Sequence, residues 1–162
     1  MNLIVAVDKN WGIGKEGQLL ASIPGDMKFF KDTTMGKVVV MGRKTLETLP
    51  KKQGLKGRIN YVITRNKNFK AENAITINSD EELEKELSKY DDDAIFIIGG
   101  ASIYEKFVDK CNICYITKMD KDLNADRFMI NLDKKENFKQ VSVSELHKEN
   151  GIGYRFVKYE KI

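Results

Sequence analysis

The chain has 162 residues, a net charge of +4 from 28 basic and 24 acidic side chains, and 41% hydrophobic residues, which is typical of one folded domain over residues 1–162. The small, dispersed positive charge argues against nucleic-acid binding, and no apolar run approaches the roughly 18 residues of a membrane span. The apolar segment 2–7 stops at Asp8 and lacks the flanks of a signal peptide, so we expect a strand there and a cytoplasmic protein.

Short apolar, β-branched runs predict about eight strands. A helix is expected from Pro24, a short one over 43–49 that Pro50 cannot continue, and another after the capping box that begins at Ser79. This alternation predicts an α/β class: a single-domain, three-layer fold with a mostly parallel central sheet, helices on both faces and a C-terminal antiparallel hairpin turning at 149–153. The predicted strands are 3–7, 38–41, 59–64, 74–77, 95–98, 113–117, 138–143 and 154–159.

A G-x-G-x-x-G motif, Gly12 to Gly17, follows the first predicted strand. A Rossmann dinucleotide site needs these glycines to form the strand–helix turn itself, with an acidic residue closing the second strand. Here four residues intervene from Asp8, Pro24 comes too early for a normal helix, and basic residues follow the 38–41 strand. The motif therefore predicts a long glycine-rich loop at the carboxyl edge of the sheet, where lids move.

Two strand–glycine–helix junctions favour a ligand with two phosphates. They are Val38–Thr45, with Gly42 at the turn, and Ile95–Tyr104, with Gly99 and Gly100. Unpaired backbone N–H groups at a helix start attract anions, and glycine lets a phosphate approach the backbone. Packing alone also produces such junctions, but Arg43 and Lys44 add positive charge at the first one, which indicates a nucleotide cofactor.

The cysteines and the single histidine do not predict a metal site. Cys111 and Cys114 form C-x-x-C without a second pair, and His147 is far away in sequence. The segment leads into a strand, where residues three apart point to opposite faces, so we expect two free, reduced thiols and no metal. His147, among charged residues, is expected on the surface.

Asp26 is the most informative ionisable group. It stands near the start of the helix that follows Pro24. A first-turn acid complements the helix dipole, which is the ordinary explanation. The alternative is a carboxylate in an apolar cleft that pairs with a cationic or amidine-like heterocycle.

Taken in order, these motifs make the chain resemble the dihydrofolate reductases of the bacterial type over nearly its whole length. The matching residues are Ile13-Gly14, Pro24-x-Asp26 with Phe30, Val40-Met41-Gly42-Arg43-x-Thr45, Gly57-Arg58, Ile98-Gly99-Gly100 with Tyr104, and Tyr115-x-Thr117. The resemblance implies hydride transfer from NADPH to C6 of dihydrofolate and a proton to N5, giving tetrahydrofolate for one-carbon metabolism. Diaminopyrimidine antifolates would be inhibitors, and nothing in the sequence demands more than a monomer.

The resemblance also implies roles for individual residues. Asp26, with Thr117 as its hydrogen-bonding neighbour and Leu19 nearby, would form the catalytic group. The substrate pocket would be lined by Ile4, Ala6, Met27, Phe30 and Leu49, and Arg58 would grip the glutamate carboxylate of the substrate. Thr64 and Arg65 would meet the 2′-phosphate of NADPH. The remaining cofactor contacts would be Ala6, Ile13, Gly14, Gly42, Arg43, Lys44, Thr45, Ile98, Gly99, Gly100, Ala101, Ser102, Ile103 and Tyr104.

Two segments depart from the family pattern. Leu20-Ala21 stand where the family usually has Pro-Trp, which bears on loop shape and proton delivery. After Asp126, Arg127-Phe128-Met129 replace the usual Thr-x-Phe-Pro, which bears on the loop contact of Asp126.

Two other functions stay open at this point. A pyrimidine reductase of riboflavin synthesis shares the fold and the cofactor, although Asp26 and Arg58 argue against it. A non-catalytic nucleotide-binding domain would keep the phosphate junctions without needing Asp26.

Overall fold

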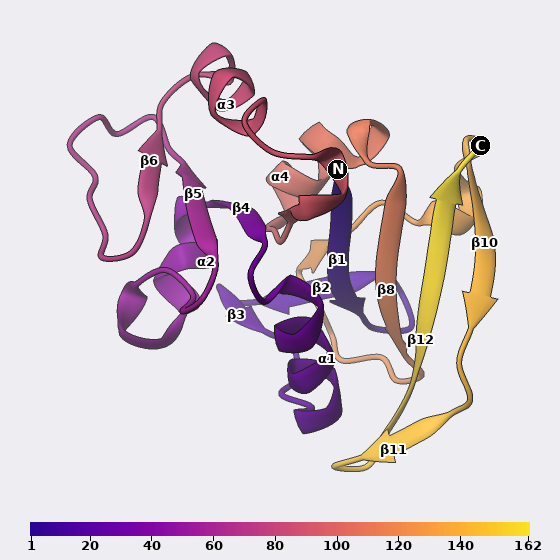
Figure 1. Cartoon of the computed structure of the whole chain (residues 1–162). Coiled ribbons are helices and arrows are strands. Elements are labelled where there is room, and N and C mark those ends of the chain that lie inside the picture. The colour runs from indigo at the N-terminus through magenta and orange to yellow at the C-terminus, as the bar shows by residue number, and fades with distance from the viewer.

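The central sheet of the computed structural model, which describes residues 1–162, contains nine strands. Eight follow one path, β10-β12-β8-β1-β7-β4-β5-β6, which runs in Figure 1 from β10 at the right to β6 at the left. Neighbours from β8 to β6 are parallel, whereas β12 pairs antiparallel with β8, β10 and β11. The strands are β1 (Asn2–Val7), β4 (Val38–Gly42), β5 (Ile59–Ile63), β6 (Ile75–Ile77), β7 (Ile95–Ile97), β8 (Ile113–Met119), β10 (Phe138–Val143), β11 (His147–Glu149) and β12 (Ile152–Lys161).

All eight predicted strands are confirmed, and β11 is an addition to them. The C-terminal hairpin is also confirmed, because β10 pairs antiparallel with β12. Its tight turn, however, joins β11 to β12. Asn150 and Gly151 have φ of 52° and 74° at this turn, the left-handed conformations that make Asn-Gly a favoured hairpin pair.

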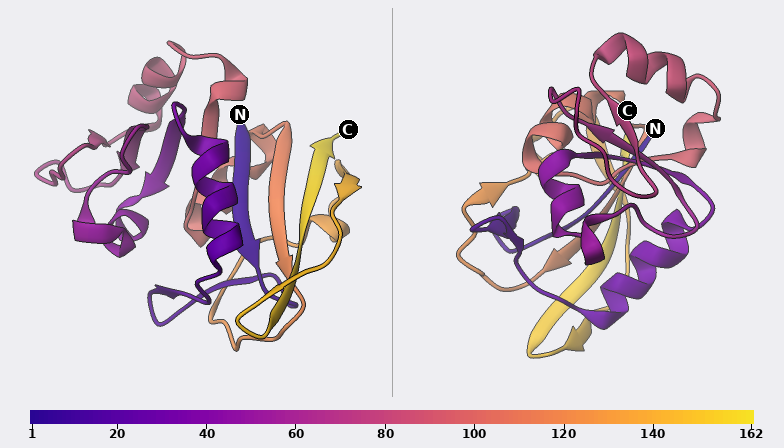
Figure 2. Two further views of the ribbon diagram at one scale, coloured as in Figure 1. Left: turned by 60° about the horizontal axis from the view of Figure 1, so that its bottom comes forward. Right: turned by 90° about the vertical axis from the view of Figure 1, so that its left-hand side faces the viewer.

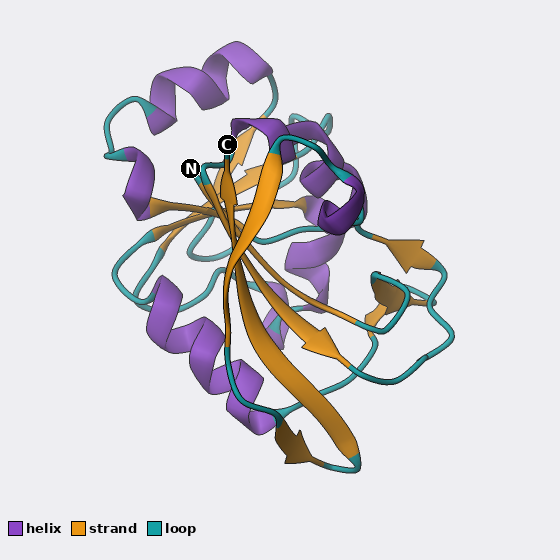
Figure 3. Ribbon diagram, turned by 90° about the vertical axis from the view of Figure 1, so that its right-hand side faces the viewer, coloured by secondary structure: helices purple, strands orange, loops and turns teal.

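Helices cover both faces of the twisted sheet, as predicted (Figure 3). Because side chains alternate along a strand, Val38 and Val40 pack in one hydrophobic cluster while Val39 and Met41 pack in another. The first cluster includes residues of α3 and α4, and the second is contacted by α1 and α2. The helices are α1 (Pro24–Thr34), α2 (Arg43–Thr48), α3 (Asp80–Leu87) and α4 (Ala101–Phe107), with 3₁₀ turns at η1 (Pro50–Lys52), η2 (Asp92–Ala94), η3 (Val108–Lys110) and η4 (Leu132–Lys134).

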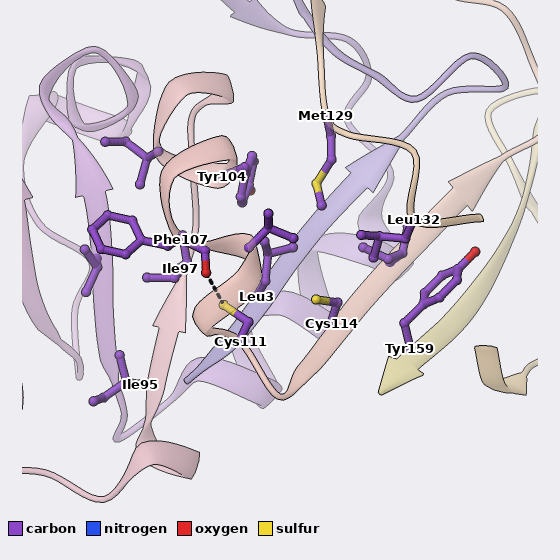
Figure 4. Packing of buried hydrophobic residues seen from close by; sticks show 14 of the residues in the cluster. Leu3, Ile95, Ile97, Tyr104, Phe107, Cys111, Cys114, Met129, Leu132 and Tyr159 are labelled. Carbon is purple, nitrogen blue, oxygen red and sulfur yellow. Dashed lines mark hydrogen bonds between the residues drawn. The ribbon is translucent and has the colours of Figure 1, made fainter. Parts of the chain in front are cut away.

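Both cysteines lie in the first cluster, shown in Figure 4. Cys111 ends the η3 turn and donates its thiol hydrogen to the carbonyl of Phe107, 3.3 Å away, and Cys114 is in β8. The expectation of opposite faces is therefore wrong, because Cys111 precedes the strand and does not follow its alternation. Both thiols are free and buried, and burial raises the pKa of Cys111 to about 12.

The glycine-rich segment is not simply a loop. Gly12–Lys15 forms β2, which pairs with β3 (Gln18–Leu19) and with β9 (Arg127–Phe128) in a separate three-stranded sheet. These short strands cannot be predicted from the local sequence, because they carry no apolar alternation and form only by pairing between distant segments. None of the helices has both the length and the apolar character needed to cross a membrane.

Candidate active site

Asp26 and Thr117 form a hydrogen-bonded pair between α1 and β8. Helix α1 lies across the face of the sheet, as the left view of Figure 2 shows. Thr117 is only 2% exposed, and its hydroxyl donates to Oδ1 of Asp26 over 2.6 Å. Burial raises the pKa of Asp26 above that of an ordinary aspartate, and the bond from Thr117 lowers it in part. The carboxyl therefore keeps a proton to higher pH than an exposed aspartate does.

The start of α1 fixes where Asp26 stands. Pro24 occupies the first helical position, which needs no N–H donor. Ile23 before it is buried, and the N–H of Met27 donates to the carbonyl of Ile23 to close the first turn. Asp26 thus falls in the first turn, where a negative charge complements the helix dipole.

The predicted lining of the substrate pocket is brought together in part. Ile4 is buried in the second cluster, and Phe30 and Leu49 pack against it. Ala6 packs against a third cluster that is centred on Ile23 and Tyr154. Met27 is 59% exposed, so its side chain is not packed with the other predicted lining residues.

Arg58 lies at the other end of α1. Its Nε donates to the carbonyl of Lys56 over 2.9 Å, and its Nη1 donates to Oγ1 of Thr34 over 3.2 Å. The hydroxyl of Thr34 donates in turn to the carbonyl of Phe30. Partial burial lowers the pKa of Arg58, but a guanidinium stays charged in proteins. A fixed cation therefore stands at the C-terminal end of α1, whereas Asp26 stands at its N-terminal end.

The two predicted strand–glycine–helix junctions lie side by side. β4 and β7 are parallel neighbours, and the N–H of Gly42 donates to the carbonyl of Gly99 over 2.9 Å. A Cβ on Gly100 would stand 3.3 Å from Oγ1 of Thr45, so the second junction packs directly on α2. Gly99 has a φ of +118°, a backbone conformation that suits glycine. The two glycine turns therefore present one continuous backbone surface.

Tyr104 packs beside the glycine turn and is bonded to β1. Its ring is buried, and its hydroxyl donates to the carbonyl of Ile4 over 2.8 Å. Burial raises the pKa of Tyr104, and the nearby charge of Asp26 adds to that shift. Ile98 and Ile103 are also buried beside the turn, while Ala101 is half-buried and Ser102 exposed.

The basic residues gather at the same edge of the sheet. Arg43 and Lys44 follow β4, and Thr64 and Arg65 follow β5, its parallel neighbour. Arg43 donates to Glu47 over 2.9 Å in an i,i+4 ion pair, so its positive charge already has a partner within α2. Lys44 and Arg65 are exposed.

The small sheet joins the glycine-rich segment to the segment around Asp126. Oδ2 of Asp126 accepts from the N–H of Glu16 over 3.0 Å, and the N–H of Asp126 donates to the carbonyl of Gly14. The contact of Asp126 is thus present although the residues after it differ from the family pattern. Ile13 packs against the main core, whereas Leu19 is 75% exposed and does not reach Asp26.

Sequence reasoning missed Glu149 and Tyr154, and it misplaced His147. Oε1 of Glu149 accepts from the N–H of Gly25, next to Asp26, and from the hydroxyl of Tyr154. No local pattern signals a contact that spans 124 residues. His147 is half-buried and stacks on Tyr154, with ring centroids 5.3 Å apart, so it is not a free surface side chain. Nowhere do three or more His, Cys, Asp or Glu side chains come together as metal ligands.

Comparison with known proteins identifies relatives along the full chain. The sequence profile of the family described as dihydrofolate reductase matches residues 1–161. A dihydrofolate reductase of Enterococcus faecium is 36% identical, over 97% of this chain and 94% of that protein. The bifunctional dihydrofolate reductase-thymidylate synthase 2 of Arabidopsis thaliana is 33% identical over 99% of this chain, which spans only 31% of that relative. The structure of Enterococcus faecalis dihydrofolate reductase complexed with NADP(H) and RAB-propyl superposes with a TM-score of 0.88 at 27% identity, covering 99% and 95% of the two chains.

Proposed function

Because the chain belongs to the dihydrofolate reductase family, we propose that residues 1–162 act as a single domain that reduces 7,8-dihydrofolate to 5,6,7,8-tetrahydrofolate. NADPH supplies the hydride for C6 when it is bound, and N5 receives a proton. The product feeds one-carbon metabolism. The chain is thus an NADPH-dependent oxidoreductase, as its sequence led us to expect.

The observation that carries this proposal is the hydrogen-bonded pair of the half-buried Asp26 and the buried Thr117. A carboxyl that is hydrogen-bonded on one oxygen leaves the other free for a heterocycle with adjacent N–H donors. We assign Asp26 to the ring nitrogen and 2-amino group of the pterin. Because burial raises its pKa, the same group keeps a proton to higher pH than an exposed aspartate does, which supports protonation of N5 through water.

We propose that different residues bind the ring system and the carboxylate of the substrate. Ile4 and Phe30 offer an apolar wall for the pterin and benzoyl rings, to which we add Ala6, Met27 and Leu49. Arg58 stands at the far end with its guanidinium held by Thr34, a geometry suited to a two-pronged contact with a carboxylate. We propose Leu19, which is 75% exposed, as a further member of the catalytic group.

The glycine surface suits the cofactor. A Cβ on Gly99 would stand 3.2 Å from the side chain of Tyr104, and one on Gly100 would stand 3.3 Å from Oγ1 of Thr45, so glycine lets this turn pack closely on α4 and α2. The backbone N–H groups at the start of α4 are the groups that suit a pyrophosphate. Lys44 and Arg65 are exposed cations at the same edge, which favours a ligand that carries an additional 2′-phosphate. We therefore assign the pyrophosphate to the glycine turns and the 2′-phosphate to the segment 64–65. The other cofactor contacts that we propose are Ala6, Ile13, Gly14, Gly42, Arg43, Thr45, Ile98, Ala101, Ser102, Ile103 and Tyr104.

The expected partners are small molecules. They are dihydrofolate, NADPH and, as inhibitors, diaminopyrimidine antifolates that would place their amidine-like edge on Asp26. We propose a monomer in the cytoplasm that binds neither nucleic acid nor membrane.

One assay tests this function against both alternatives. The absorbance of NADPH should fall when dihydrofolate is added, and a diaminopyrimidine antifolate should stop the fall. Oxidation of NADPH only with an aminopyrimidine of riboflavin synthesis would identify the pyrimidine reductase. Binding of NADPH without turnover of either substrate would identify a nucleotide-binding domain.

A further inference from the structure

Helix α1 receives its N-terminal cap from a distant strand. Its own N-cap residue, Ile23, has no side chain that can accept a hydrogen bond, and Pro24 carries no N–H. The first free donor is the N–H of Gly25, which donates to Oε1 of Glu149 in β11 over 3.0 Å. We propose that Glu149 is a positioning residue of the reductase, which holds the turn that carries Asp26 and offsets the positive end of the α1 dipole. This inference rests on the function proposed above for Asp26.

Glu149 is itself held rigidly. The hydroxyl of Tyr154 donates to the same oxygen, Oε1, and the Tyr154 ring is 2% exposed. The ring of His147 stacks on that of Tyr154 at an interplanar angle of 22°. Residues 147 and 154 are cross-strand partners in the β11–β12 hairpin. The carboxylate of Glu149 therefore sits on a folded hairpin and not on a loose surface segment.

The strands β8 and β12 connect the residues that hold Asp26 and Glu149. β12 pairs with β8 so that Tyr154 faces Met119 and Phe156 faces Thr117. Thr117 donates to Asp26, while Tyr154 donates to Glu149, which grips the residue before Asp26. The side chain and the backbone of the first turn of α1 are thus fixed by two pairs of one antiparallel ladder, which a single intervening pair separates.

Gly25 shows that this contact needs space at the backbone. An added Cβ would stand 2.2 Å from Oε1 of Glu149 and 2.3 Å from the hydroxyl of Tyr154. Gly25 does not have a positive φ, so its conformation alone does not demand glycine. Glycine inside a helix costs stability relative to alanine. The close approach of Glu149 and Tyr154 is the feature in the structure that requires it.

Charge gives Glu149 a second effect on Asp26. A carboxylate at a helix N-terminus offsets the positive end of the helix dipole, and this negative charge is bound to the N–H of Gly25, the residue that precedes Asp26. The other titratable groups around the two carboxyls are Tyr104 from α4, Tyr154 from β12 and His147 from β11. If Glu149 is neutral, the positive end of the helix dipole is no longer offset and Asp26 no longer has a like charge nearby. Both changes favour the ionised form of Asp26. Less Asp26 would then carry a proton at alkaline pH.

The variant Glu149→Gln tests this, since glutamine keeps the size and one acceptor oxygen but removes the charge. In the full-length protein with saturating NADPH and dihydrofolate, kcat should stay within about 1.5-fold of the parent at pH 5.5 and fall about threefold at pH 8. Glu136→Gln, which removes an equal charge from an exposed side chain in the turn before β10, should match the parent at both pH values. A Glu149→Gln profile that overlays the parent, or a lower melting temperature with unchanged kcat at both pH values, overturns the proposal.

A second background shows whether Glu149 acts through Asp26. In Asp26→Asn, the further change Glu149→Gln should alter kcat less than twofold at either pH, because the titrating group is gone. The same threefold loss in that background would refute a role through Asp26. A parent protein that does not oxidise NADPH with dihydrofolate would refute the proposed function itself, whereas an active parent with an unresponsive Glu149→Gln refutes only this inference.

Discussion

Thr117→Val isolates the hydrogen bond that supports Asp26. Valine keeps the shape of threonine in a position that is 2% exposed, so the change removes the 2.6 Å bond to Oδ1 and creates no cavity. A hydrogen bond to a charged group contributes about 1.5–3 kcal/mol, and one between neutral groups about 0.5–1.5 kcal/mol. The bond lowers the pKa of Asp26, so it stabilises the ionised carboxylate more than the neutral acid. Its loss should cost more at high pH than at low pH.

We expect Thr117→Val to lower the free energy of unfolding by about 2 kcal/mol at pH 8.5 and by about 1 kcal/mol at pH 4.5. For a chain of this size the larger value corresponds to roughly 4–8 °C in melting temperature. Calorimetry at both pH values measures it, with Thr48→Val as a control whose exposed hydroxyl bonds only within α2. An equal loss at both pH values would refute the reasoning, because the bond would then not distinguish the two charge states of Asp26.

Three further variants probe the ends of the site. Arg58→Ala should raise KM for dihydrofolate roughly 10- to 100-fold and leave the Kd of NADPH unchanged; the opposite pattern would place Arg58 in the cofactor subsite. Arg65→Ser should weaken the binding of NADPH more than that of NADH, and the difference should shrink as the salt concentration is raised. If both cofactors bind equally more weakly, Lys44 is the better candidate for the 2′-phosphate contact. Asp26→Asn should stabilise the fold near pH 7, because burial raises the folded-state pKa of Asp26 and its ionisation costs stability as pH rises. This gain in the free energy of unfolding should disappear as the pH is lowered toward 4. A gain that does not depend on pH would show that burial of the Asp26 charge is not its cause.

The elements with strong periodicity could be predicted from the sequence. Runs such as Val38–Met41 are buried on both faces of the sheet, so their continuous apolar pattern is enough to predict a strand. The helix from Pro24 and the capped helix after Ser79 carry local start signals, and Ser79 does accept from the N–H of Glu82. β2, β3 and β9 could not be predicted, because each has two to four residues and exists only through pairing between distant segments.

Some residues of the candidate site could likewise be predicted from the sequence, and others could not. Resemblance could assign Asp26, Thr117 and Arg58, since each belongs to a motif of fixed spacing. The pair of Glu149 with Gly25 depends on where a C-terminal hairpin comes to rest against α1. Nothing in the neighbourhood of either residue signals that packing.

The central claim is that Asp26 is the carboxyl that binds the pterin and supports protonation of N5. Its most direct test is the single-turnover rate of NADPH oxidation by dihydrofolate for the parent and for Asp26→Asn, across pH 5 to 8. We expect the variant to bind NADPH as the parent does and to be slower by roughly 10²–10⁴ at pH 7, the contribution of a positioned acid–base group. A variant whose rate stays within about threefold of the parent across that range would contradict the role of Asp26.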